Sequence, residues 1–206
     1  MAELRLLALG DSYTVGEGVA PVDAWPAQLV QRLRGHAHAC AAPTVLARTG
    51  WTTDELLAAL ATATLAPPYD LVTLQIGVND QYRGRRADAF AHDFDALLAQ
   101  ALRLAGGCAT RVLAVSIPDW GVTPFARQDA RAPQTIATAI DQFNARARAC
   151  ALRVGTGWVD ITSASRRAGQ APGQLCADGL HPGPAQYARW VATALLPAAR
   201  EQLPAP

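Results

Sequence analysis

The stretch Leu4-Arg5-Leu6-Leu7-Ala8-Leu9-Gly10-Asp11-Ser12 is a short apolar run that passes directly into a glycine and two small polar residues. A run of this length that ends in turn-forming residues predicts a buried β-strand over Leu4–Leu9, followed by a tight connection. Four more short runs rich in apolar residues follow along the chain and predict further strands, at Thr44–Ala47, Leu71–Ile76, Val112–Ile117 and Trp158–Ile161.

Helical patterns separate these strands. Apolar residues recur at helical spacing in stretches that begin near Asp23, Thr52, Ala87, Pro133 and Pro184. Asp23 is expected to cap the first of these helices, residues 52–55 (Thr-Thr-Asp-Glu) form a capping box, and Pro197 is expected to interrupt the last helix. The five-fold alternation of strand and helix predicts a single α/β domain over 1–206. We expect a three-layer α/β/α fold with a flavodoxin-like five-stranded parallel sheet in the order 2-1-3-4-5.

The composition excludes several classes of protein. The net charge is +1, which gives no electrostatic reason to expect binding to nucleic acid or to an anionic membrane. All 18 positively charged residues are arginine, so a Walker A lysine, a lysine nucleophile and a pyridoxal Schiff base are excluded. No apolar run approaches the length that crosses a bilayer, and we expect no membrane insertion.

The cysteines and the first residues predict the cellular compartment. Cys40, Cys108, Cys150 and Cys176 form no C-x-x-C pair, so we interpret them as reduced thiols. The first apolar run leads straight into Gly10, which leaves no room for a signal peptide and its cleavage site. Together these features predict a cytoplasmic protein.

Two segments far apart in the chain contain the residues of an activated serine nucleophile. Ser12 follows the first predicted strand, and Asp178 precedes His181 by three residues. A serine hydroxyl attacks a carbonyl only when a base removes its proton, and that base works best when a third group orients it. We therefore predict Ser12 as nucleophile, His181 as base and Asp178 as the orienting carboxylate.

The developing oxyanion of ester hydrolysis requires hydrogen-bond donors. The candidates are the backbone N–H groups of Ser12 and Gly50 and the side-chain amide of Asn79. Strands one and three are neighbours in the predicted sheet order. Ser12 and Asn79 are therefore expected to face one crevice at the carboxyl ends of the strands.

Four segments resemble the sequence blocks of the SGNH, or GDSL, hydrolase family. They are, in order, Gly10-Asp11-Ser12-Tyr13, the separate Gly50, Gly77-Val78-Asn79-Asp80 and Asp178-Gly179-Leu180-His181-Pro182. The resemblance spans nearly the whole chain. It implies a three-layer fold, hydrolysis of esters or thioesters without a metal, a Ser12-His181-Asp178 triad and an oxyanion hole of Ser12, Gly50 and Asn79. Tyr13 stands where the family more commonly has leucine, at a position that packs rather than reacts.

Simpler structural interpretations exist for several of these residues. Ser12 could be a helix cap, Asp178 could belong to an ordinary turn, and Asn79 could be a turn residue. Cys176, Asp178 and His181 form a crude metal-ligand cluster, but a zinc site needs further ligands and we predict no metal and no cofactor.

Neighbouring residues have simpler interpretations as well. Asp11 is expected to accept hydrogen bonds in the Ser12 turn, and His36, His38 and His92 are expected to be solvated. Arg83, Arg85 and Arg86 form a basic run that is either a solvated loop or a contact for an anionic part of the substrate.

Aromatic residues in predicted loops are candidates for substrate binding. Trp51, Trp120 and Phe125 either pack the loops or line an acyl or aryl pocket, with Pro118–Phe125 as its wall. We predict a serine esterase that cleaves carboxylic esters of short acyl or aryl groups through an acyl-enzyme, with a small-molecule ester as its partner. The alternatives are a carbohydrate O-deacetylase or acyl-CoA thioesterase with the same triad, or a non-catalytic small-ligand-binding protein. The sequence leaves the oligomeric state open.

Overall fold

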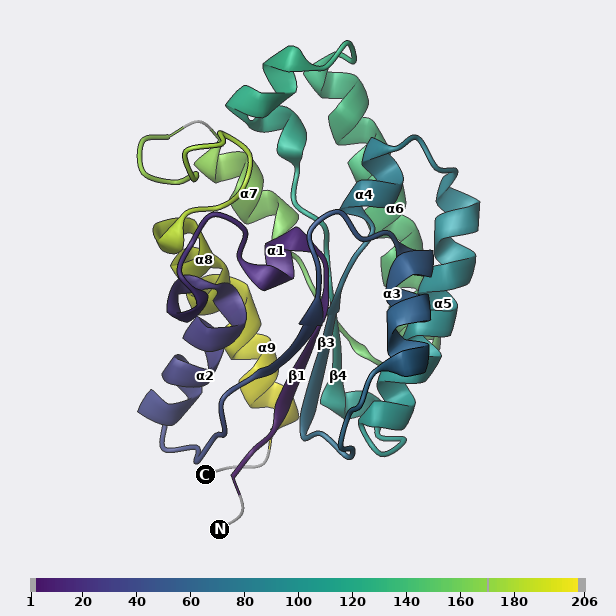
Figure 1. The fold of residues 1–206 in the computed structure, drawn as a ribbon, viewed down its shortest axis with the longest axis vertical. Coiled ribbons are helices and arrows are strands. Elements are labelled where there is room, and N and C mark those ends of the chain that lie inside the picture. The colour runs from purple at the N-terminus through teal and green to yellow at the C-terminus, as the bar shows by residue number, and fades with distance from the viewer. Residues whose placement is uncertain (1–2, 170, 204–206) are drawn as a thin grey trace.

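A parallel β-sheet forms the centre of the computed structural model, which describes residues 3–169 and 171–203 (Figure 1). Its strands lie in the order β2-β1-β3-β4-β5, as predicted, and neighbouring strands are parallel throughout. In the register of the sheet, Leu9 is the partner of Leu46 on one side and of Leu74 on the other. The strand bounds are β1 Leu6–Gly10, β2 Thr44–Ala47, β3 Leu71–Gln75, β4 Val112–Val115 and β5 Gly157–Val159.

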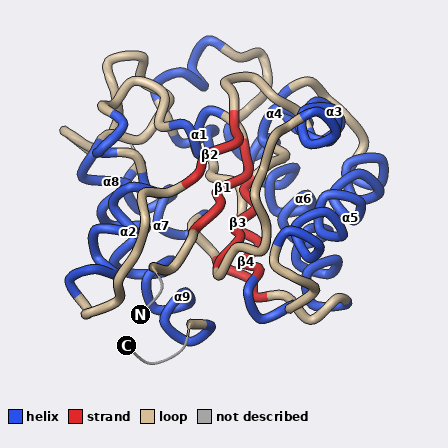
Figure 2. Tube along the Cα trace, turned by 60° about the horizontal axis from the view of Figure 1, so that its bottom comes forward, coloured by secondary structure: helices blue, strands red, loops and turns tan. Residues whose placement is uncertain are grey.

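Helices cover both faces of the sheet, which Figure 2 shows as helical layers on either side of the strands. One layer contains α2, α8 and α9, and the other contains α3, α5 and α6. The helix bounds are α1 Ser12–Val15, α2 Trp25–Gly35, α3 Thr53–Thr62, α4 Val78–Tyr82, α5 Ala87–Leu104, α6 Pro133–Arg153, α7 Thr162–Ala168, α8 Pro184–Trp190 and α9 Leu196–Gln202. Shorter 3₁₀ turns lie at Pro21–Asp23, Ala109–Arg111, Trp120–Val122 and Pro124–Gln128.

The core explains why the strands are apolar. All residues of β1, β3 and β4 are buried, because helices cover both faces of these central strands. The helix α5 turns one apolar stripe toward the sheet, with Phe90, Phe94, Leu97, Leu98 and Ala101 almost fully buried. Edge strand β2 is different, since Thr44 and Val45 are exposed.

Helix boundaries agree with the sequence only in part. The capping box at the start of α3 is confirmed, with the Thr52 N–H donating to the Glu55 carboxylate over 2.9 Å. Asp23 was predicted to cap α2 but lies in the preceding 3₁₀ turn, and Ala24 occupies the cap position. Pro197 does not break the last helix, because it lies in the first turn of α9, directly after a π-helical turn at Val191–Leu195.

Other sequence expectations concern single residues. Cys40, Cys108, Cys150 and Cys176 are free thiols. His38 is buried, contrary to the prediction that it is solvated. In the part of the chain that the structure describes, no helix is both long enough and apolar enough to span a bilayer.

Candidate active site

A chain of hydrogen bonds joins Ser12, His181 and Asp178 at the carboxyl edge of the sheet. Ser12 is the first residue of α1, which begins directly after β1 and Asp11. Its Oγ lies 3.0 Å from the Nε2 of His181, and the Nδ1 of the same imidazole lies 2.6 Å from the Asp178 Oδ2. The structure therefore brings together the three side chains that the sequence predicts to react, across 169 positions of the chain.

The segment that contains His181 is held by its own aspartate. The Oδ1 of Asp178 accepts hydrogen bonds from the backbone N–H groups of Leu180, at 2.9 Å, and of His181, at 3.0 Å. Burial acts to raise the pKa of Asp178, but the hydrogen bonds from the His181 side chain and from these two N–H groups outweigh it and hold the pKa below its ordinary value. Asp178 is thus ionised at neutral pH and fixes both the backbone and the ring of His181.

Two oxyanion candidates come from the segments that follow β2 and β3, the strands on either side of β1. Gly50 follows β2 and has a φ of +86°, a conformation that favours glycine. A Cβ on Gly50 would come no closer than 3.7 Å to the Arg83 Nη2, so the need for glycine here is conformational rather than steric. Asn79 lies in α4, directly after β3, and its amide Nδ2 donates to the Trp51 carbonyl over 2.9 Å.

The remaining oxyanion candidate is the main chain of Ser12. Because Ser12 is the first residue of α1, its N–H has no partner inside the helix. The primary amide of Asn79 also retains a second N–H after the bond to the Trp51 carbonyl. Ser12 and Asn79 therefore each retain a donor for a ligand.

Asp80 anchors α4 to the start of α3. Its carboxylate is fully buried and accepts from the Thr53 N–H at 3.0 Å and from the Thr53 hydroxyl at 2.7 Å. Arg85 pairs with the same carboxylate at 2.9 Å and also with Asp93 and Asp54. This network fixes the loop between Gly50 and α3 relative to Asn79.

Asp11 precedes Ser12 and holds the start of α1. Its Oδ1 accepts from the Tyr13 N–H over 3.0 Å and caps α1, which confirms the predicted role as a hydrogen-bond acceptor in this turn. Its other oxygen, Oδ2, is buried with no hydrogen-bond partner among the described residues. Burial raises the pKa of Asp11 to about 8, despite the hydrogen bond from Tyr13.

A mostly apolar pocket of about 170 Å³ opens beside the Ser12 hydroxyl. The predicted Trp120 and Phe125 line it, and the Trp120 indole N–H donates to Gln81 over 2.7 Å. The full lining consists of Ser12, Tyr13, Thr49, Gly50, Val78, Asn79, Tyr82, Trp120, Phe125, Leu180 and His181.

The interpretation of Trp51 as a pocket residue requires correction. Its side chain does not line the pocket but packs against the hydrophobic core, and it is its backbone carbonyl that contacts Asn79. Tyr82 lines the pocket instead and contacts Trp120, with ring centroids 5.3 Å apart. The sequence analysis missed Tyr82, because α4 spans only Val78–Tyr82 and gives no helical periodicity.

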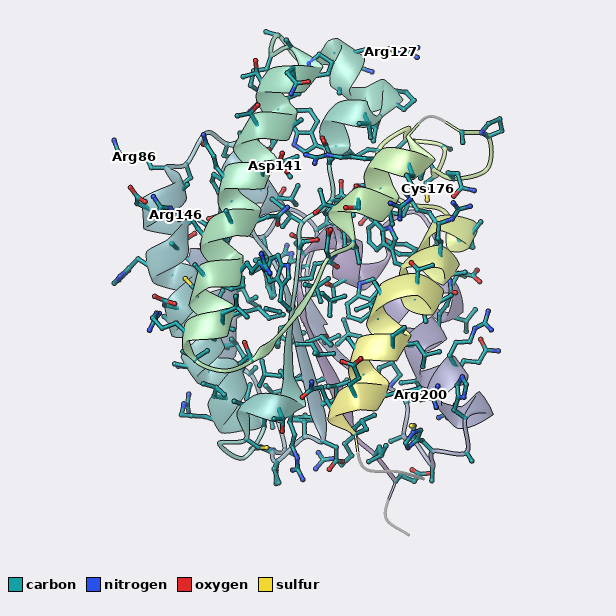
Figure 3. All side chains as sticks on the ribbon, turned by 180° about the vertical axis from the view of Figure 1, so that it is seen from behind. Arg86, Arg127, Asp141, Arg146, Cys176 and Arg200 are labelled. Atoms are coloured by element: carbon teal, nitrogen blue, oxygen red, sulfur yellow. The ribbon has the colours of Figure 1, made fainter. Side chains whose placement is uncertain are left out.

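The basic run has a structural role at two of its three positions. The Nη2 of Arg83 donates to the Gly50 carbonyl over 2.6 Å, and Arg85 belongs to the Asp80 network. Arg86 lines a groove between α5 and α6, on the side of the sheet opposite Cys176, as the view from behind shows (Figure 3). Within the described ranges, no group of three or more His, Cys, Asp or Glu side chains is arranged to hold a metal ion.

Comparison with known proteins identifies relatives of this arrangement. The model of the GDSL-like lipase/acylhydrolase family matches residues 8–189. A search of curated protein sequences found no match.

Solved structures share the fold at low sequence identity. The crystal structure of TesA superposes with a TM-score of 0.76 at 23% identity, covering 97% of this chain and 99% of TesA. A lipase/acylhydrolase from Enterococcus faecalis gives 0.75 at 20% identity, with 98% of each chain covered. Axe2, an acetylxylan esterase from Geobacillus stearothermophilus, gives 0.72 at 20% identity, covering 98% of this chain and 97% of Axe2.

Proposed function

Because this chain belongs to the GDSL-like lipase/acylhydrolase family of serine hydrolases that act on esters, we propose that it hydrolyses carboxylic esters of short acyl or aryl acids through an acyl-enzyme on Ser12. The observation that carries the proposal is the continuous hydrogen-bond chain from Ser12 through His181 to Asp178. Ser12 and His181 both line a small, mostly apolar pocket.

The imidazole is arranged to accept the serine proton. Its Nδ1 faces the ionised Asp178, so the ring proton resides on Nδ1 and Nε2 is left with its lone pair toward the Ser12 hydroxyl. As the Ser12 Oγ bonds to the ester carbonyl carbon, His181 takes its proton. The same imidazolium then returns the proton to the departing alcohol as the C–O bond breaks. Water then attacks the acyl-enzyme while His181 takes its proton. The imidazolium returns the proton to the Ser12 Oγ as the bond to the acyl group breaks and the acid leaves.

The oxyanion of each tetrahedral intermediate is stabilised by neutral donors. The Ser12 and Gly50 N–H groups and the free N–H of Asn79 act together on the developing charge. Donors fixed in advance are worth about 3–4 kcal/mol each in such sites. Gly50 is held by Arg83 and Asn79 by the Trp51 carbonyl, which supports their role as preorganised groups.

The pocket size favours a short or flat acyl group. Its lining is mostly aromatic and aliphatic, and a volume of about 170 Å³ lies below the range of about 300–1,000 Å³ usual for drug-sized ligands. Acetylated carbohydrates and acyl-CoA thioesters present a comparable carbonyl to the same triad. The fold similarity to an acetylxylan esterase makes an acetylated sugar the first alternative to include in a screen.

Covalent labelling and a substrate series test the proposal. A fluorophosphonate should label the wild-type protein at Ser12 and leave Ser12→Ala unlabelled. p-Nitrophenyl esters should be cleaved fastest from acetate to butyrate, and far more slowly as palmitate. Labelling that persists in Ser12→Ala would contradict Ser12 as the nucleophile. Activity that peaks at palmitate would contradict the proposed substrate class.

A further inference from the structure

An apolar groove of about 460 Å³ runs along edge strand β2, apart from the catalytic pocket. We call it the β2 groove; it is lined by Thr14, Val15, Pro21, Val22, Ala24, Pro26, Ala27, Pro43, Val45 and Ala47. Val15, Val22 and Val45 expose 38%, 72% and 43% of their surface. Among the described residues, the other large apolar side chains with such exposure are Tyr82, in the catalytic pocket, and Leu152, on α6. This gathering of exposed apolar side chains in one hollow indicates a binding surface.

Both walls of the β2 groove lead to the catalytic pocket. The helix α1 begins at Ser12 and ends in the groove at Val15, about 4.5 Å further along the helix axis. The other wall is β2 with the loop that follows it. This segment lines the groove at Ala47 and the catalytic pocket at Thr49 and Gly50. Because α1 packs against β2 (Figure 2), the groove and the catalytic pocket lie next to each other along both segments, although no residue lines both.

The boundary between groove and pocket is polar, with Glu17 after α1 and Arg48 between Ala47 of the groove and Thr49 of the pocket. The Thr49 hydroxyl donates a hydrogen bond to the Glu17 carboxylate, which joins the segment after α1 to the loop after β2. The Cys176 Sγ contacts the Glu17 carbonyl, so this boundary adjoins the loop that leads to His181. Charges of both signs at this boundary favour neither an anionic nor a cationic ligand and are compatible with an uncharged chain.

The catalytic pocket and the β2 groove have separate linings. The apolar walls of the catalytic pocket are formed by Val78, Tyr82, Trp120, Phe125 and Leu180, and none of these residues lines the β2 groove. His181 must protonate the departing alcohol, and the boundary that leads to the groove lies next to the His181 loop. The acyl group thus occupies the pocket, and the alcohol departs toward Glu17 and Val15.

We propose that the β2 groove binds the alkyl chain of the alcohol, so that the substrates are short-acyl esters of uncharged long-chain alcohols. This inference rests on the proposed function. The size of the β2 groove suits a flexible chain, since about 460 Å³ falls within the range of about 300–1,000 Å³ for small-molecule sites. A single alkyl chain is favoured over a protein or a membrane, because both segments that form the walls of the groove also reach the catalytic pocket.

An alcohol-chain series tests the inference at constant acyl group. Methyl, butyl, hexyl and octyl acetate all form the same acetyl-enzyme, so differences in kcat/KM report the alcohol alone. Complete removal of a methylene from water is worth about fourfold in binding, so an open groove should raise kcat/KM about twofold per methylene beyond butyl. A flat series in the wild-type protein would overturn the inference, whereas failure to hydrolyse methyl acetate would count against the proposed function itself.

Variants at groove residues test whether the groove causes the dependence of kcat/KM on the length of the alcohol. Val22→Ser and Val45→Thr remove apolar surface at exposed positions, and Val45→Thr keeps the β-branched shape that suits a strand. Each should lower the octyl-to-methyl ratio of kcat/KM by about twofold to fourfold. Leu152→Ser, at an exposed apolar position on α6 outside the groove, should keep the wild-type ratio.

Other occupants of the groove would give different results. Sedimentation of the wild-type protein and of Val22→Ser should show the same oligomeric state. The wild-type protein and Val22→Ser should bind neutral phosphatidylcholine vesicles to the same extent. A dimer that dissociates in Val22→Ser, or vesicle binding lost in that variant, would overturn the alkyl-chain assignment in favour of a second copy or a lipid surface.

Discussion

The side-chain amide of Asn79 donates a hydrogen bond to the backbone carbonyl of Trp51, over 2.9 Å, and so ties α4 to the loop that contains Gly50. This bond uses one of the two amide N–H groups and directs the other away from the Trp51 carbonyl. It also means that two of the proposed oxyanion donors are held in a fixed relation. Their geometry is set before a substrate arrives, as efficient electrostatic stabilisation requires.

We expect Asn79→Ala to lower kcat about 10²–10³-fold with little change in KM, because its donor acts on charge that develops only in the transition state. Steady-state kinetics with p-nitrophenyl acetate measures both constants. Asn79→Asp keeps the shape but cannot donate when ionised, so it should be at least as impaired as Asn79→Ala. A loss of less than about fivefold in Asn79→Ala would remove this side chain from the oxyanion hole, since donors of this kind contribute far more.

We expect Gly50→Ala to destabilise the protein by about 1–3 kcal/mol and to lower kcat, because alanine resists the φ of +86° and rotates the proposed donor N–H. Gly35→Ala provides a matched control, since Gly35 is in α2 and a Cβ there meets no atom within 4 Å. That control should stabilise by about 0.5–1 kcal/mol. Urea unfolding gives both free energies. Equal effects of the two substitutions would show that the backbone of Gly50 is not special.

The sheet order and the proximity of Ser12 to His181 were predictable, because both depend on patterns spread over the whole chain. Alternating strands and helices restrict a parallel sheet to few topologies. The carboxyl ends of such strands gather the connecting loops at one edge. The Thr52–Glu55 capping box was predictable for a different reason, because its partners are only three residues apart.

Contacts made by backbone atoms and by short helices were not predictable. The sequence draws attention to the Trp51 indole, whereas the structure uses the Trp51 carbonyl, a group that every residue possesses. Tyr82 ends a helix too short to show a periodic pattern. The Asp80–Arg85 pair depends on the fold of α4 against α3, so the basic run could equally be interpreted as a solvated loop.

The buried Asp11 predicts a pH-dependent stability that is independent of the triad. Its pKa is raised from an ordinary 3.8 to about 8, so the folded protein holds this proton more tightly than the unfolded chain does. Its contribution to stability is therefore fully present below pH 3.8 and is lost as the pH rises toward about 8. Asp11→Asn keeps an oxygen that can accept from the Tyr13 N–H and removes the titration.

We therefore expect the Tm of Asp11→Asn to exceed that of the wild type at pH 8 and the difference to shrink toward pH 5. Thermal unfolding followed by circular dichroism across this range measures it. Asp178 affects stability in the opposite sense, because its pKa is lowered in the folded protein. Its contribution to stability is present above the pKa of the unfolded chain and is lost in acid. The two effects therefore occupy different pH windows. A difference in Tm that does not depend on pH would show that Asp11 is ionised in the folded protein.

The catalytic pocket should respond to the size of Phe125. This side chain lines the pocket, and its backbone N–H donates to the Gly179 carbonyl over 3.1 Å, so truncation leaves the loop attached to the segment that contains His181. Phe125→Ala should open the pocket beyond 170 Å³ and raise the octanoate-to-acetate ratio of kcat/KM by at least about tenfold, since one methylene in an apolar pocket is worth about 10–200-fold. Leu152→Ala on α6 should leave that ratio unchanged. If Phe125→Ala slows all p-nitrophenyl esters by the same factor, then Phe125 supports the loop and does not measure the acyl chain.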